Sequence, residues 1–264
     1  MATYETCVSL LVMAGTAALT AGCRQLVCQF RYRKPTLYSF LMELSGSFQI
    51  CACTHELRLL ADLPPKPQIA LALTYVFTAF HGWSLPDSNN NPASSFQLLS
   101  RNRAWRRRAW RLQTSAQFIG ALLANIYIKS IWRLGVIPAH SRALGESCSY
   151  PIQTTLASAF LLELLFSFLV HLALLKFESM NHERKIHLLA LLITTFVYEG
   201  GHLTGAIFNP ALAFSLHLSC FLEKFWNYTL VYWVAPCIGS ILVAVVWDEV
   251  IPHTRSQFNI QESL

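Results

Sequence analysis

Charged side chains are scarce in this 264-residue sequence. Only 13% of its residues are Asp, Glu, Lys or Arg, whereas a soluble globular chain usually carries about 25%. Polar domains are lacking too, since 54% of the residues are hydrophobic and the mean hydropathy is +0.40. These shortages exclude an ordinary soluble domain and predict that nearly all of the mass lies in a lipid bilayer.

The apolar segments also lack the side chains of an intramembrane enzyme, because they contain no nucleophile–base pair and no His/Asp cluster. Cys51, Cys53, His55 and Glu56 lie close together, and Cys51 and His55 share a helical face at i and i+4. Two ligands on one helix without a second cluster make a poor metal site. We therefore expect a protein that is not an enzyme and that uses neither a cofactor nor a metal.

Long apolar runs are what the sequence does have. A membrane-spanning helix needs roughly 20 mainly apolar residues, and candidates lie near 7–22, 38–61, 69–85, 114–132, 155–176, 186–200 and 227–250. We expect the sixth to be cut short by Gly200 and Gly201. Basic charges follow the first candidate instead of preceding it, which argues against a cleaved signal peptide. It is predicted to be an uncleaved extra helix with a non-cytosolic N-terminus.

The distribution of basic residues predicts the orientation. If the spans alternate in direction, 14 of the 20 Lys and Arg residues fall on one side, in the segments 24–34, 101–111, 176–185 and the C-terminal tail. The positive-inside rule places that side in the cytosol. The run 101–111 is interpreted as a topology-setting loop, with contact to anionic lipid as an alternative. Nucleic acid is excluded as a partner because no nucleic-acid-binding fold surrounds the run.

One tripeptide occurs twice, as Asn91-Pro92-Ala93 and Asn209-Pro210-Ala211. Asn is a good N-cap and Pro suits the first helical position, so each copy predicts the start of a helix. Two such starts inside a membrane protein suggest two half-helices whose positive ends face a pore. The asparagine amides would meet at mid-membrane and donate hydrogen bonds to a passing solute, while the two helix dipoles oppose cations and protons.

The tripeptides belong to a longer internal repeat. Glu43 and Glu163 each begin the pattern Glu-Leu-x-x-Ser-Phe, at similar distances before Asn91 and Asn209. Three spans per unit is an odd number, so the two units must be inverted relative to each other. We interpret both glutamates as acceptors for the irregular backbone before each half-helix, with a proton relay as the alternative.

Two such boxes in an inverted repeat, each with an upstream intramembrane glutamate, resemble the aquaporin (major intrinsic protein) family. The resemblance implies an all-α membrane protein, with a right-handed bundle of six transmembrane helices in two inverted repeats plus two re-entrant half-helices. The extra N-terminal helix with its basic segment is then 1–35, the channel domain 36–251 and the cytosolic tail 252–264. The two repeats within the channel domain are 36–134 and 153–251.

Several stretches resemble the unorthodox branch of that family, namely residues 48–57, 185–189 and 203–208, together with Cys220 nine residues beyond Ala211. Members of this branch typically have an altered first box, which is intact here. By resemblance Cys220 is the subfamily cysteine. A Cys148–Cys220 disulfide is chemically permitted in non-cytosolic loops, but a free Cys220 that supports packing or assembly is our prediction.

The resemblance also assigns the outer constriction. Water-selective relatives usually carry Arg directly after the second box, where this chain has Leu212. The family pattern assigns Val197 and Ala206 to the same constriction. Such an apolar, wider lining implies passage of water and of small neutral solutes such as glycerol and hydrogen peroxide. Glu199 and His202 are expected in an exposed loop, with added polarity at the mouth as the alternative.

Two further expectations come from the resemblance alone, a homotetramer and residence in the endoplasmic reticulum membrane, with the plasma membrane or another intracellular membrane as alternatives. A secondary transporter built on inverted repeats is the competing function class. It would need a charged or ion-coordinating site at the midplane, and only Glu43 and Glu163 offer one.

Overall fold

The computed structural model describes residues 2–61, 68–101, 107–145 and 151–250, and no strand occurs within these ranges. Its helices are α1 (Ala2–Cys28), α2 (Pro35–Leu60), α3 (Gln68–Ser84), α4 (Pro92–Arg101), α5 (Arg107–Trp132), α6 (Pro138–Gly145), α7 (Leu156–Lys176), α8 (His182–Thr204), α9 (Pro210–Leu216), α10 (Leu218–Glu223), α11 (Phe225–Thr229) and α12 (Ala235–Val245). The π-helical turns η1 (Leu230–Val234) and η2 (Val246–Val250) flank α12.

Four of the described helical segments are long and apolar enough to cross a membrane by length and composition: Tyr4–Cys28, Leu156–Lys176, His182–Thr204 and Phe225–Asp248. The last is one helical stretch assembled from α11, η1, α12 and η2. Its π turn η1 lies directly before α12, whose second residue, Pro236, has no N–H to donate to the preceding turn.

The expectation that Gly200 and Gly201 cut the sixth span short is wrong. Helix α8 continues through both glycines to Thr204, and Gly205 at a φ of 86° ends it. The reason is packing: a Cβ on Gly200 would lie 2.5 Å from the ring of Phe166 on α7. Glycine allows α7 and α8 to approach closely here, so it favours the helix–helix contact instead of a break. Glu199 and His202 are consequently exposed helical residues, not loop residues as expected.

The two repeats cross in the same way. Helix α2 packs on α5 and α7 packs on α12. In the first crossing a Cβ on Gly120 would lie 2.4 Å from the carbonyl oxygen of Leu44, and in the second a Cβ on Gly239 would lie 2.4 Å from that of Leu164. Leu44 and Leu164 are equivalent positions of the repeated Glu-Leu-x-x-Ser-Phe pattern. This pattern therefore marks a close approach of two helices within each repeat.

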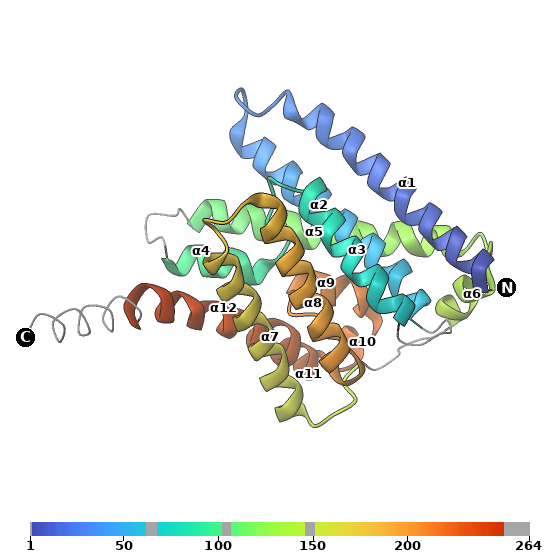
Figure 1. Ribbon diagram of the computed structural model, residues 1–264. Helices are drawn as coiled ribbons and strands as arrows, with labels where there is room; N and C mark the ends of the chain where they lie inside the picture. Colours follow the sequence, from blue (N-terminus) through green and yellow to red (C-terminus); the bar gives the residue numbers. More distant parts are fainter. Residues whose placement is uncertain (1, 62–67, 102–106, 146–150, 251–264) are drawn as a thin grey trace, which may run out of the picture.

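The repeats also interlock, because each half-helix packs on the last long helix of the other repeat: α4 on α12, and α9 on α5. Arg101 at the end of α4 forms an ion pair with Asp248, with Nε 2.9 Å from Oδ2. Figure 1 shows the short helices α4 and α9 among the long ones.

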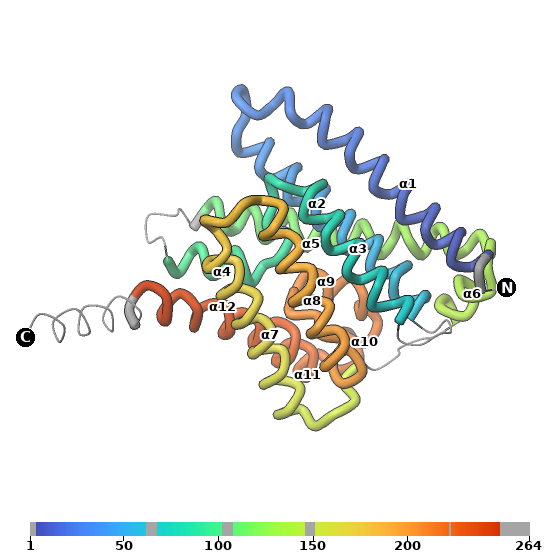
Figure 2. Tube along the Cα trace, in the orientation of Figure 1, coloured from blue at the N-terminus to red at the C-terminus, as the bar shows by residue number. Residues whose placement is uncertain are grey.

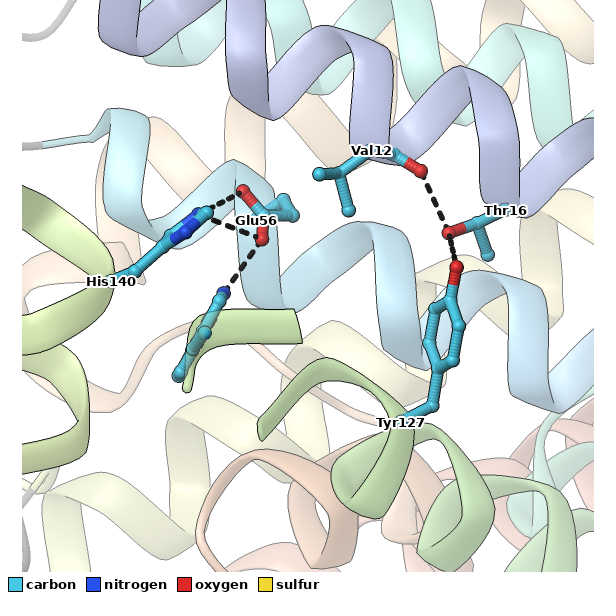
Figure 3. Close-up of polar contacts among 6 residues, drawn as sticks. Val12, Thr16, Glu56, Tyr127 and His140 are labelled. Carbon is cyan, nitrogen blue, oxygen red and sulfur yellow. Dashed lines mark hydrogen bonds and ion pairs between the residues drawn. The ribbon is translucent and has the colours of Figure 1, made fainter. Parts of the chain in front are cut away.

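Helix α1 lies along one edge of the bundle, and the chain doubles back from its end into α2 (Figures 1 and 2). Its buried stripe is mostly polar and recurs every three or four residues: Glu5, Ser9, Met13, Thr16, Thr20 and Arg24. Thr16 donates to the carbonyl of Val12 and its Oγ1 lies 3.3 Å from the Tyr127 hydroxyl of α5, as Figure 3 shows. The apolar side chains Leu11, Leu19 and Leu26 are exposed. The helix thus turns its polar face to the protein and its apolar face outward, as a helix beside lipid should.

A second polar cluster fastens α6 to the end of α2. Glu56 is fully buried and accepts a 2.6 Å hydrogen bond from Nε1 of Trp132, and its carboxylate lies 3.3 Å from Nε2 of His140. Figure 3 shows the His140 ring directed at the Glu56 carboxylate. His55 beside it contacts Ser215 of α9, with 3.2 Å between Nε2 and Oγ. Glu56 and His55, two of the residues considered for a metal site, therefore contact other protein side chains. The described residues contain no group of three His, Cys, Asp or Glu suited to a metal ion.

Candidate functional site

The two Asn-Pro-Ala boxes begin helices α4 and α9, each with proline in the first helical position. The Asn91 Oδ1 accepts from the backbone N–H of Ala93 at 2.9 Å, and Asn209 Oδ1 accepts from those of Ala211 at 3.0 Å and Leu212 at 3.3 Å. A cap of this kind contributes about 1 kcal/mol to a helix. The Asn-Pro sequence thus fixes both helix starts locally.

Each box asparagine is also bonded to the backbone of the opposite box. The Nδ2 of Asn91 donates to the carbonyl of Phe208 at 3.2 Å, and the Nδ2 of Asn209 donates to the carbonyl of Asn90 at 2.8 Å. Asn90 and Phe208 each precede a box and have positive φ angles, 55° and 36°. This unusual backbone turns their carbonyls toward the opposite asparagine. Since an amide NH₂ carries two hydrogens, each asparagine retains one further donor.

The buried glutamates hold the backbone just before each box. Glu43 accepts from the N–H groups of Asn89 at 2.8 Å and Asn90 at 2.9 Å, and from Nε2 of Gln117 at 2.9 Å. These are the backbone contacts that we expected of Glu43, whereas the side-chain donor Gln117 on α5 carries no signal in the sequence.

Glu163 makes the equivalent contacts in the second repeat. It accepts from the N–H groups of Ile207 at 3.1 Å and Phe208 at 2.6 Å, and from the Thr204 hydroxyl at 2.6 Å. Both carboxylates are thus occupied by the loops that lead into the half-helices, and neither glutamate lines the cavity described next.

A cavity of about 900 Å³ passes between the boxes. Both box asparagines line it, as do the three residues assigned to the outer constriction, Val197, Ala206 and Leu212. On α8 the lining extends from Ile186 to His202, which is about 24 Å at 1.5 Å per residue. The hydrocarbon core of a bilayer is about 30 Å thick, so the cavity follows most of that depth.

The three residues assigned to the outer constriction come from three different local structures. Val197 is on α8, and Leu212 is in the first turn of α9. Ala206 lies between them in the left-handed region, with a φ of 48° and its N–H on the Thr204 hydroxyl at 3.2 Å. The three residues that were assigned to the constriction from the sequence thus line one cavity.

Several polar lining residues had no signal of their own in the sequence. Thr74, Thr78 and His81 form one face of α3 toward the cavity, and the buried Nε2 of His81 has no hydrogen-bond partner among the described residues. Ser94, three residues after Asn91, lies 3.0 Å from Nε2 of the buried His171. The i, i+4, i+7 spacing on α3 could have indicated a shared face, but not that the face borders a cavity.

The prediction of a free Cys220 is wrong, because Cys220 is disulfide-bonded. Cys220 is buried in the hydrophobic cluster that joins α9 to the helical stretch after it, and this packing holds the side chain in place. Among the described residues six cysteines are free: Cys7, Cys23, Cys28, Cys51, Cys53 and Cys237. Cys148 lies outside the described residues. Cys220 is in helix α10 and not in a loop as expected. A disulfide requires an oxidising compartment, which is compatible with the predicted non-cytosolic side for this segment.

Comparison with known proteins gives a consistent result. The family profile described as "Major intrinsic protein" matches residues 65–247. Aquaporin-11 of Equus caballus is 40% identical over 260 residues, covering 98% of this chain and 95% of that protein, and Aquaporin-11 of Homo sapiens is 37% identical over the same length with the same coverage. Aquaporin-12 of Mus musculus is 29% identical over 237 residues, 86% of this chain and 81% of that protein. In fold, the chain resembles the X-ray structure of the aquaglyceroporin from Plasmodium falciparum, with a TM-score of 0.61, 20% identity, and coverage of 82% of this chain and 97% of that one.

Proposed function

Because this chain belongs to the major intrinsic protein, or aquaporin, family, whose members are membrane channels and not enzymes, we propose that it conducts water, glycerol and hydrogen peroxide passively through the cavity between its two boxes. The observation that carries the proposal is the pair of capped helix starts, Asn91 and Asn209, on the wall of one cavity whose length is most of the thickness of a bilayer's hydrocarbon core.

The asparagines would act on a solute through the donor that each amide retains. Their other amide hydrogens are bonded to the opposite loops, at 3.2 Å for Asn91 and 2.8 Å for Asn209. Two oriented donors and two positive helix ends then meet at the same depth. A solute that accepts hydrogen bonds is stabilised there, whereas a cation loses its hydration and faces positive potential.

The polar groups around this centre offer a solute hydrogen-bond acceptors as well as donors. The 2.7 Å contact between His171 Nδ1 and the carbonyl of Ser167 makes Nδ1 the donor, so Nε2 accepts from the hydroxyl of Ser94. The oxygen of Ser94 is then oriented as an acceptor at the cavity wall. Val197, Ala206 and Leu212 add apolar surface nearer the predicted extracytosolic end, which supports passage of solutes larger than water.

The competing function, a secondary transporter, has little support from these contacts. It relied on Glu43 and Glu163 as the midplane site, but both carboxylates accept three hydrogen bonds within the protein. Neither is available to bind a coupled ion without disrupting a half-helix.

The test is solute flux into proteoliposomes that contain the purified full chain, measured by stopped-flow light scattering for water, glycerol and hydrogen peroxide. We expect flux that rises linearly with the gradient and falls when Asn209 is replaced by Leu, which removes both the cap and the donor. Saturable uptake driven by an ion gradient would reject the channel in favour of the transporter. Wild-type flux no greater than that of empty vesicles would reject both.

We also propose residence in the endoplasmic reticulum membrane and assembly as a homotetramer. The disulfide at Cys220 supports an oxidising lumen on that side of the membrane. Fluorescence co-localisation and crosslinking in intact membranes test these two proposals separately from solute flux.

A further inference from the structure

A permanently charged side chain, that of Arg58, lies in the wall of the cavity. Among the described residues that line it, Arg58 is the only Lys or Arg, and none is Asp or Glu. Arg58 is in the last turn of α2 and is exposed. The wall of the cavity is therefore not purely apolar.

A buried histidine holds this guanidinium. The Nη1 of Arg58 lies 3.0 Å from Nε2 of His217. Arginine can only donate, so Nε2 must accept and the ring carries its hydrogen on Nδ1. His217 itself is 4% exposed and stacks on Tyr232, with ring centroids 6.2 Å apart. A buried and stacked acceptor fixes the direction in which the guanidinium points.

The position along the cavity follows from the second half-helix. His217 is the C-cap of α9, and His55, one turn before Arg58, contacts Ser215 of the same helix. Two residues from the last two turns of α2 thus contact the C-terminal end of α9. Because α9 has seven residues, its end lies about 10 Å from its start at 1.5 Å per residue. The guanidinium is therefore about one half-helix beyond the box, past Leu212 and Leu216 of the lining.

From this arrangement we propose that Arg58 is a specificity-determining residue at the predicted extracytosolic end of the channel, and that His217 is its positioning residue. The proposal rests on the channel function argued above. The guanidinium repels cations before they reach the boxes and donates hydrogen bonds to the oxygen atoms of entering neutral hydroxyl- or peroxide-bearing solutes. Cations thus meet positive potential at two depths, once at Arg58 and once between the helix starts.

The experiment compares the potassium leak and the glycerol flux of proteoliposomes that contain the full-length wild type, Arg58→Gln or Arg58→Lys. Two unit charges 4 Å apart in water already interact strongly enough to change a population roughly fivefold. We therefore expect Arg58→Gln to raise the leak at least about fivefold and to keep measurable glycerol flux. Arg58→Lys should leak like the wild type, because it keeps the charge.

Two further variants separate this role from structural effects. Arg133→Gln removes an exposed arginine that follows α5 and does not line the cavity, so its leak should equal the wild-type value. His217→Phe keeps a ring for the stack on Tyr232 and loses the acceptor, so it should raise the leak by less than Arg58→Gln does.

An unchanged leak in Arg58→Gln, or an equal rise in Arg133→Gln, overturns the proposal while leaving the channel function intact. If Arg58→Gln does not elute as a monodisperse protein, His217→Phe decides, and a wild-type leak there rejects the assignment. Absence of wild-type glycerol flux and water flux would instead reject the proposed function itself.

Discussion

Replacing Glu163 by Gln tests how firmly the second half-helix is held. One carboxylate oxygen accepts from the Thr204 hydroxyl and the N–H of Ile207, and the other accepts from the N–H of Phe208 at 2.6 Å. Glutamine has a single side-chain oxygen, so its NH₂ group must face at least one of these donors. Glu163→Gln leaves the shape of the side chain almost unchanged, but it places the NH₂ donor of glutamine against another hydrogen-bond donor of the loop.

The magnitude follows from burial. Ile207 is 5% exposed and Phe208 is 8% exposed, so water does not readily replace the lost acceptor. A buried donor without a partner costs about 1–3 kcal/mol. For a protein of this size, 1 kcal/mol shifts the Tm by about 2–4 °C, and we expect Glu163→Gln to lower it by about 4–8 °C, the shift for about 2 kcal/mol.

Glu43→Gln is the matched control from the first repeat. Its new NH₂ group can face the N–H of Asn89, an exposed residue, while the remaining oxygen keeps the bonds from Asn90 and Gln117. Solvent then replaces the lost acceptor, and the cost should be at most about 1 kcal/mol.

The assay is thermal unfolding of both full-length variants in the same detergent, followed by circular dichroism, with monodispersity checked by gel filtration. A shift for Glu43→Gln as large as that for Glu163→Gln would refute the reasoning from burial. An unchanged Tm for Glu163→Gln would refute the role of the carboxylate in holding the loop.

Three other outcomes are expected. Leu212→Arg should narrow the cavity and lower glycerol or peroxide flux more than water flux in stopped-flow assays, and equal loss for all solutes would count against Leu212 in the constriction. Gly120→Ala should lower stability by about 1–3 kcal/mol because its Cβ would meet a backbone carbonyl at 2.4 Å, whereas Gly15→Ala on α1 meets nothing within 4 Å and should not be destabilising in the same thermal assay. A double-mutant cycle with Thr16→Val and Tyr127→Phe should give a coupling of about 0.6 kcal/mol, and zero coupling would show that their 3.3 Å contact does not contribute to docking α1.

The sequence was most informative where structure is determined locally. The starts of α4 and α9 depend on Asn followed by Pro, and this information lies within three residues. The glutamates could be paired with the boxes because the repeat supplied two copies of one arrangement. Their acceptor geometry then followed from the cost of unpaired backbone at membrane depth.

Features that depend on a distant partner were not predictable. Gly200 appeared to be a helix breaker because propensity alone disfavours glycine, but the partner that requires it, Phe166, is on another helix. The role of Arg58 was not predictable either, since nothing in one sequence indicates that His217 lies 3.0 Å away. Cys220 could not be paired because proximity in space decides whether a disulfide forms.

The reciprocal bonds between the boxes have a consequence for how the protein is made. They join residues that are 117 and 119 positions apart in the chain. A ribosome delivers Asn91 to the membrane well before Phe208 exists, at about 5–20 residues per second. During that interval Asn91 has no Phe208 carbonyl to which it can donate, so the first re-entrant loop lacks its hydrogen bond to the second box. Completion of the centre is therefore a late event of biogenesis, and a chain interrupted before the second box cannot form it.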